Sequence, residues 1–212
     1  MATPHMVASG RFEDILLVVL AYFLRRHGHY MVHAFGAAWQ AEQGILLIGG
    51  SGSGKTTTGL NLITQGWQLL ANDAPLLTER PSGVFALPTP GLVSIRPPTF
   101  GLLPRLLGLL GLAAVPQRQI WFAAARFGAA APAVPIRKLF FPHITDQPTS
   151  HVEPLNRAVA LAQLLEESVD RWDAATTNGH IALLERLTMQ ASVYTLHLGR
   201  NLAQIAELVV SG

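Results

Sequence analysis

Cysteine is missing from the 212-residue sequence, and charged side chains are scarce, at 13% of all residues. Without cysteine the chain has neither disulfides nor thiolate metal sites, which fits a reducing compartment and predicts a cytoplasmic location. The net charge of +2 includes no block of lysine and arginine, so we expect no binding of nucleic acid. Half of the residues are hydrophobic, which argues against disorder and predicts that part of the surface meets a partner.

Long apolar runs are also absent. The nearest candidate, residues 15–24, is much shorter than the roughly 20 apolar residues that a membrane-spanning helix needs. It lacks the flanks of a signal peptide, because acidic residues precede it and Arg25-Arg26 follow it without a small-residue cleavage site. We therefore expect no membrane span, a flexible leader over residues 1–10, and a buried helix over residues 12–24.

What the sequence does contain is a phosphate-binding pattern. Residues 49–56 read Gly-Gly-Ser-Gly-Ser-Gly-Lys-Thr, which matches Gly, any four residues, then Gly-Lys-Ser/Thr. The glycines let several backbone N–H groups point at one phosphate. Lys55 adds a positive charge for the outer phosphates, and Thr56 adds a hydroxyl for Mg²⁺. The expected nucleotide-binding residues are Gly49, Gly50, Ser51, Gly52, Ser53, Gly54, Lys55, Thr56 and Thr57.

The segments on either side support this interpretation over a glycine-rich turn without a ligand. Residues 44–48 form a short apolar run that is typical of a strand buried on both faces. Residues 57–66 form a helical stretch that ends at Gly66. This strand, loop and helix predict a site for ATP or another nucleoside triphosphate, together with Mg²⁺.

Two further residues are candidates for the same site. Asp73 follows a short strand at residues 67–71, where an acid can hold Mg²⁺ or accept a proton from an attacking hydroxyl. The alternative role for Asp73 is that of a turn or capping residue. His33 stands near the end of the strand adjacent to the nucleotide strand, and it is either a hydrogen-bonded core histidine or a site residue.

The remaining pattern predicts one α/β domain over residues 11–212, with a mixed central sheet flanked by helices. Further strands are expected at residues 76–78, 83–87, 92–96, 136–142 and 192–198. Helices are expected at residues 155–169, with Glu166 and Glu167 facing outward, at residues 178–187, beginning at Asn178, and at the end of the chain, beginning at Asn201. Residues 99–135 are rich in Gly, Ala, Leu and Pro, and they predict either a cover over the site or a surface for homo-oligomer formation.

Three stretches together resemble the catalytic domain of HPr kinase/phosphorylase and its HPr-kinase-like relatives. They are His33-Ala34, the loop at 49–56, and residues 64–73, which read Thr-Gln-Gly-Trp-Gln-Leu-Leu-Ala-Asn-Asp. The resemblance spans about residues 12–210, and the relatives include small serine kinases encoded with lasso-peptide genes. It implies an α/β fold of the P-loop type and a kinase that moves the γ-phosphate of ATP to a serine of a protein or peptide, with Mg²⁺.

Carried over position by position, the resemblance gives each candidate a role. Lys55, Asp73 and His33 would be catalytic, and Thr56 and Asp73 would bind the metal. The sequence departs from the family at Asn72, where the family has a second aspartate. If Asn72 takes the position of the general base, an amide cannot accept a proton near neutral pH, and the protein is a catalytically weak nucleotide-binding regulator. A kinase or ATPase acting on a small molecule is a third reading, because the loop specifies phosphates and not the acceptor.

Overall fold

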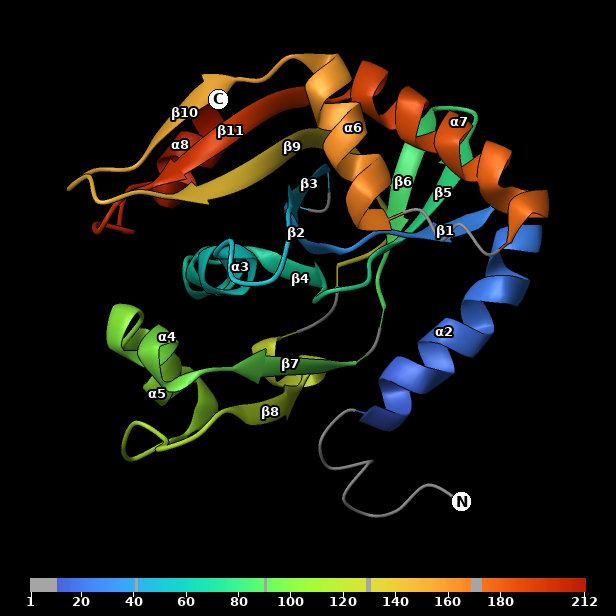
Figure 1. The fold of residues 1–212 in the computed structure, drawn as a ribbon. Helices are drawn as coiled ribbons and strands as arrows, with labels where there is room; N and C mark the ends of the chain where they lie inside the picture. The colour runs from blue at the N-terminus through green and yellow to red at the C-terminus, as the bar shows by residue number, and fades with distance from the viewer. Residues whose placement is uncertain (1–10, 41, 90, 129–130, 169–172) are drawn as a thin grey trace.

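A large mixed sheet forms the centre of the computed structural model, which describes residues 11–40, 42–89, 91–128, 131–168 and 173–212 (Figure 1). The expected leader at 1–10 lies outside the described residues. Nine strands make up the sheet: β1 (His29–Met31), β2 (Ala34–Trp39), β3 (Gln43–Ile48), β4 (Gln68–Ala71), β5 (Leu76–Arg80), β6 (Gly83–Leu87), β9 (Val134–Ile144), β10 (His151–Pro154) and β11 (Ser192–Leu198). A separate pair consists of β7 (Leu92–Ile95) and β8 (Ile120–Ala123).

The long strand β9 joins the parts of the sheet. It pairs in parallel with β3 on one edge and with β11 on the other, and its first residues pair antiparallel with β6. Beyond β3 the sheet continues antiparallel through β2 to β4. Beyond β6 it continues through β5 to β1, and the whole sheet curls (Figure 1). Parallel and antiparallel pairs in one sheet confirm the predicted mixed topology.

Helices cover both faces of this sheet, because alternate strand residues point to opposite sides. On one face, α6 (Arg157–Ser168) and α7 (Ala174–Gln190) pack on a core that includes Leu46, Ile48 and Leu164. On the other face, α3 (Lys55–Thr64) and α8 (Ile205–Ser211) pack on a core that includes Phe35 and Leu47. The α/β expectation, with helices flanking a mixed central sheet, is confirmed.

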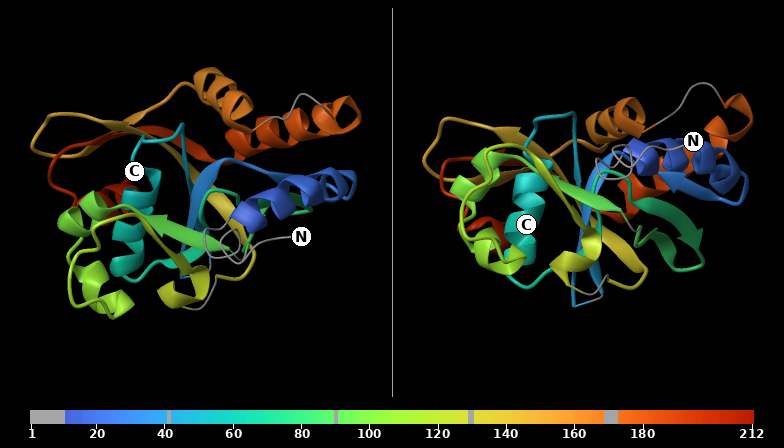
Figure 2. Two further views of the ribbon diagram at one scale, coloured as in Figure 1. Left: turned by 60° about the horizontal axis from the view of Figure 1, so that its bottom comes forward. Right: turned by 90° about the horizontal axis from the view of Figure 1, so that it is seen from below.

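The segment at 99–135 contributes to the second core. It contains most of α4 (Pro97–Leu102), α5 (Arg105–Leu110) and the 3₁₀ helix η1 (Ala124–Phe127). Figure 2 shows α4 and α5 on the same side of the sheet as α3. Five of its large apolar side chains are buried in the core that includes α3: Phe100, Leu103, Leu106, Leu110 and Phe127. Four others are exposed: Leu102, Leu109, Val115 and Trp121. Burial inside this chain therefore accounts for much of the apolar composition. A role as a cover or as a surface for homo-oligomers stays a prediction.

Several predicted boundaries are wrong. Helix α7 begins at Ala174 and runs through Asn178, and α8 begins at Ile205. Asn201 instead accepts a hydrogen bond at Oδ1 from the N–H of Ala203, at 2.9 Å, in a turn before α8. Asparagine favours caps and turns equally, so its presence alone does not locate a helix end.

The first helix, α2 (Arg11–Arg26), forms where it was predicted, but it is not buried along its length. Val19 is 55% exposed and Phe23 is 57% exposed, whereas Ala21 is buried. None of the described helices is both long enough and apolar enough to cross a membrane.

Candidate functional site

The phosphate-binding pattern lies where β3 ends and α3 begins. Gly52 has a φ of 88° and Gly54, at the cap of α3, has a φ of 99°, both in the left-handed region that favours glycine. A Cβ on Gly54 would stand 2.6 Å from Cδ1 of Leu198, so the loop also packs closely against the end of β11. The N–H group of Thr58 already bonds the carbonyl of Gly54, at 2.9 Å. The N–H groups of the preceding three helix residues are those that a helix leaves without an intrahelical partner.

Lys55 extends from the first turn of α3 back over the loop. Its ammonium group donates hydrogen bonds to the carbonyls of Gly49 and Gly50, the latter at 3.0 Å. Only 6% of Lys55 is exposed, and this burial lowers the pKa of its ammonium group, while the carboxylates of Asp73 and Glu167 act in the opposite direction. The result is a poorly hydrated positive charge held at the loop, where an anion would stabilise it.

Thr56, Asn72 and Asp73 form a connected polar group beside the start of α3. The hydroxyl of Thr56 donates to Oδ1 of Asn72 at 3.5 Å, and Nδ2 of Asn72 donates to Oδ2 of Asp73 at 2.9 Å. Asp73 has a φ of 66°, a left-handed conformation that aspartate and asparagine adopt more readily than most residues. The structure thus brings the predicted acid and the predicted metal-binding hydroxyl together, with Asn72 between them.

His33 reaches the site from the bend just before β2, the strand that pairs with β3. Ala34 pairs with Ile48, and His33 therefore stands level with the first glycines of the loop. Its side chain is 38% exposed, which does not fit the alternative of a core histidine. Its Nδ1 lies 3.1 Å from Oε2 of Glu167.

The prediction that Glu167 faces outward is wrong. Glu167 lies in the last turn of α6, its side chain is 23% exposed, and Oε1 would be 3.3 Å from a Cβ on Gly50. The helical stripe in the sequence could not reveal this, because it separates the apolar from the polar side of α6 but does not show that the last turn of this helix lies beside the loop. The neighbouring Glu166 is exposed, as predicted.

A cavity of about 390 Å³ opens beside the loop. That volume lies within the range of about 300–1,000 Å³ that is usual for small-molecule sites. Its walls come from the loop and first turn of α3, from the turn after β4, from the β7–α4 segment, and from the residues just before β2 and at the end of β9. Its polar lining residues are His33, Ser51, Lys55, Thr56, Thr57, Asp73, Ser94, Arg96 and Thr99.

The side chains around this cavity fit a phosphate group and Mg²⁺. Two cations, Lys55 and Arg96, face it together with one carboxylate, Asp73. The Oγ of Ser53, inside the loop, is buried and has no hydrogen-bond partner among the described residues. A buried hydroxyl without a partner is costly, and a phosphate oxygen would satisfy it. Thr99 of α4, which the sequence did not single out, approaches the same helix turn, with its hydroxyl 3.2 Å from that of Thr57.

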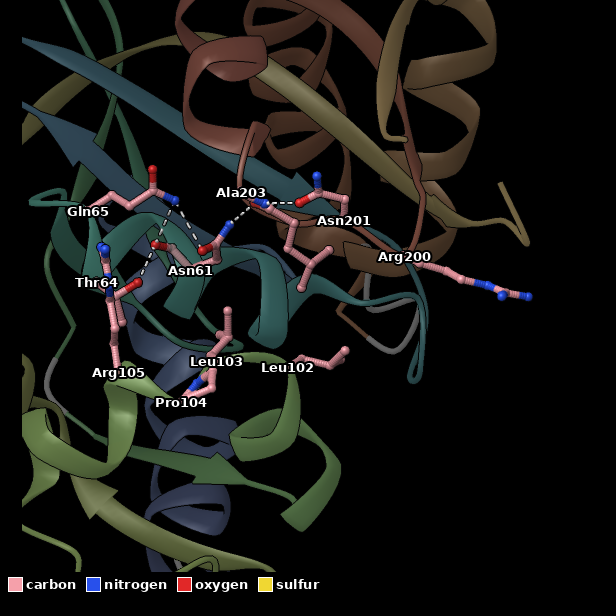
Figure 3. Close-up of a pocket in the computed structure, with 11 residues that line it drawn as sticks. Asn61, Thr64, Gln65, Leu102, Leu103, Pro104, Arg105, Arg200, Asn201 and Ala203 are labelled. Carbon is pink, nitrogen blue, oxygen red and sulfur yellow. Dashed lines mark hydrogen bonds between the residues drawn. The ribbon is translucent and has the colours of Figure 1, made fainter. Parts of the chain in front are cut away.

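A second cavity, of about 460 Å³, lies farther along α3 and contains no residue of the loop (Figure 3). Its amide groups are occupied within the chain. Nδ2 of Asn61 donates to the carbonyl of Leu202 at 2.6 Å, and Nε2 of Gln65 donates to Oδ1 of Asn61 at 3.1 Å (Figure 3). The first bond fixes α3 to the segment before α8, and the second orients Asn61 from the end of the same helix, so we assign this cavity a packing role.

No family model matches the chain, and no curated protein matches it. Among solved structures, the Hpr(Ser) kinase/phosphatase from Coxiella burnetii shows a distant structural similarity. The alignment has 14% identity and a TM-score of 0.33, and it covers 86% of this chain and 99% of that chain. At these values the likeness decides neither the fold nor the function, and both rest on the residues described above.

Proposed function

We propose that the protein is a P-loop phosphotransferase that uses ATP and Mg²⁺ to phosphorylate a serine hydroxyl of a protein or peptide. One observation carries this proposal: Lys55, Thr56 and Asp73 line a single cavity at the glycine loop. Phosphoryl transfer needs a charge clamp on the phosphates, a metal position and a group that takes the proton of the acceptor, and these three side chains can supply them. The serine acceptor follows from the resemblance of the sequence motifs and not from the cavity.

The proposed reaction is an in-line displacement at the γ-phosphorus. Asp73 accepts the proton of the serine hydroxyl, whose oxygen forms a bond to phosphorus while the bond to the bridging oxygen of ADP breaks. Lys55 leaves the carbonyls of Gly49 and Gly50 and pairs with the phosphate oxygens, as do the N–H groups of the loop. Mg²⁺, when bound, would neutralise charge on the phosphates, with Thr56 and Asp73 as its protein ligands.

The arrangement of Asn72 and Asp73 favours Asp73 as the base. Asp73 lines the cavity, whereas the side chain of Asn72 is directed to Thr56 and to Asp73. The missing carboxylate is therefore the one nearest to the metal-binding hydroxyl. Loss of charge at that place weakens the hold on Mg²⁺ and leaves the proton acceptor in position.

The second candidate is a nucleotide-binding regulator with weak catalysis. It is favoured by the same asparagine, because an amide beside Thr56 gives the site one negative charge fewer than the paired acids of the resembling family. In this case Asp73 serves only the metal, and transfer is slower by about 10²- to 10⁴-fold, the usual contribution of a general base.

Transfer of label from γ-labelled ATP separates the two candidates. The purified protein is incubated with Mg²⁺, labelled ATP and serine-bearing peptides, beside Lys55→Ala and Asn72→Asp variants. If Asp73 alone suffices as the general base, the wild type labels a peptide, and the Lys55→Ala variant does not. Label that is transferred only by Asn72→Asp would establish the regulator. The proposal would be overturned if the wild type and Asn72→Asp both bound ATP but neither labelled a peptide nor hydrolysed the nucleotide.

A further inference from the structure

Three histidines stand side by side on neighbouring strands, near the carboxyl ends of β9 and β11. His143 of β9 pairs with His197 of β11, and His197 pairs with His151 of β10. Figure 1 shows these three strands next to one another. Residues that are directly opposite in a sheet point to the same face, so the three imidazoles form a row. Glu153 lies two residues after His151 and shares its face. None of these residues lines the cavity that holds Lys55, Thr56 and Asp73, whereas His143 lines a separate cavity of about 350 Å³ beside Gly49 and Gly50.

The side chains of His151, Glu153 and His197 already converge. Nε2 of His151 lies 3.6 Å from one carboxylate oxygen of Glu153, and Nε2 of His197 lies 3.4 Å from the other. The two imidazole rings are stacked, with their centroids 4.4 Å apart and their planes 7° apart. One ligand atom from each of the three residues fits within a span of 4.8 Å.

We propose that His151, Glu153 and His197 bind a divalent transition metal, with Zn²⁺ as the preferred ion. Two imidazoles and one carboxylate are a ligand set that Zn²⁺ accepts, whereas Mg²⁺ prefers oxygen ligands alone. Tetrahedral ligands at the usual Zn²⁺ distances lie about 3.4 Å from one another, close to both histidine–glutamate separations. Small side-chain movements bring the third pair to this distance.

The fourth position of a tetrahedral ion would face His143 or water. The ring of His143 meets that of His197 edge-on, with the centroids 5.9 Å apart. The three ligand side chains are between 22% and 62% exposed, so an ion can enter from solvent. Among the described strands β10 pairs only with β11, and the metal would tie this edge strand to its neighbour. Bound Zn²⁺ should therefore stabilise the pairing of β10 with β11, because a ligand that binds only the folded state favours the folded state.

The test is a titration of the metal-free, full-length protein with zinc chloride in competition with a chromophoric chelator. We expect one Zn²⁺ per chain. The affinity for Zn²⁺ should fall by at least about tenfold in His151→Ala, in His197→Ala and in Glu153→Gln. Loss of a residue that only hydrogen-bonds to a metal ligand already costs about that much, and loss of a ligand itself should cost no less. The matched control is His27→Ala, an exposed histidine next to the end of α2, which should bind Zn²⁺ like the wild type.

A second measurement keeps the test independent of folding defects. Imidazole NMR signals of the wild type should shift with Zn²⁺ for two histidines, and circular dichroism should show the same fold in every variant. Equal Zn²⁺ affinity in the wild type and the three ligand variants would overturn the proposal. So would the absence of Zn²⁺ binding in the wild type, in which case Glu153 only forms ion pairs with the two histidines.

Discussion

The Nδ1 atom of His33 and the Oε2 atom of Glu167 lie 3.1 Å apart although 134 positions separate these residues in the chain. This pair joins the strand beside the loop to the last turn of α6. Glu167 also acts on the charge of Lys55, whose pKa it raises against the effect of burial. The carboxylate is therefore placed to control both a histidine and the lysine of the nucleotide site.

The first prediction concerns pH and Lys55. Burial lowers the pKa of the free Lys55 ammonium from 10.5, so the group loses its proton in a window below that value. In this window the unfolded chain binds more protons than the folded one, and the stability of the nucleotide-free protein rises with pH. Binding of a phosphate needs the charged form, so MgATP affinity falls as pH rises, by up to about tenfold per unit for one linked proton. Calorimetric titrations at increasing pH measure this, and Lys55→Arg should bind without the alkaline loss.

A second prediction follows for Glu167→Gln. Removal of this carboxylate takes away a charge that raises the pKa of Lys55, so the alkaline loss of MgATP affinity moves to lower pH. The matched control is Glu166→Gln, the exposed neighbour, for which the pH profile should stay in place. Identical profiles for Glu167→Gln and the wild type would contradict a role of Glu167 at Lys55.

A third prediction separates chemistry from binding at Asp73. Asparagine tolerates the left-handed φ of 66°, so Asp73→Asn should keep the backbone. Because Asp73 is also a proposed Mg²⁺ ligand, the variant is compared at saturating Mg²⁺ and ATP, so that weaker binding does not limit the rate. The rate of phosphoryl transfer in single-turnover experiments should fall by about 10²- to 10⁴-fold, because the amide accepts no proton. An unchanged rate would show that Asp73 is not the base. Asp73→Ala is a poorer test, since alanine at this φ adds backbone strain of about 1–2 kcal/mol.

A fourth prediction concerns the packing that holds α3 under the loop. A Cβ on Gly59 would stand 2.2 Å from Cε1 of Phe35, in a buried contact between α3 and β2. Gly59→Ala should therefore lower the free energy of unfolding by about 1–3 kcal/mol, the usual cost of overpacking. Gly108→Ala is the control in α5, where a Cβ meets no atom within 4 Å. It should be neutral or stabilising in chemical denaturation, because alanine favours a helix.

Local patterns were enough to predict the elements around the loop. The strand at 43–48, the glycine loop and α3 all follow from residues that are adjacent in sequence, as do the β2–β3 and β5–β6 hairpins. The positions of Asp73 and His33 near the loop were also predictable, because both flank short strands close to β3: His33 precedes β2, which pairs with β3, and Asp73 follows β4, which pairs with β2. These features depend on short-range periodicity and turn chemistry.

Contacts between distant segments could not be predicted in this way. The row of histidines depends on the order and register of β9, β10 and β11, and a change of one residue in register would turn a histidine to the opposite face. The pairing of Glu167 with His33 and the burial of Leu106 depend instead on where α6 and α5 pack on the sheet. The strand at Leu92–Ile95 was predicted as such, but its place outside the central sheet depends on its partner at Ile120–Ala123.

The central claim is that the loop holds the phosphates of a nucleoside triphosphate, and calorimetric titration with MgATP tests it without knowledge of the acceptor. We predict one site per chain, no binding of adenosine, and a loss of about 10- to 100-fold in Lys55→Ala, since a hydrogen bond to a charged group contributes about 1.5–3 kcal/mol. Lys138→Ala is the matched control, because this lysine also has a pKa lowered by burial but bonds the carbonyls of Val209 and Val210 away from the loop. Failure of the wild type to bind MgATP, or equal affinity in Lys55→Ala, would contradict the claim.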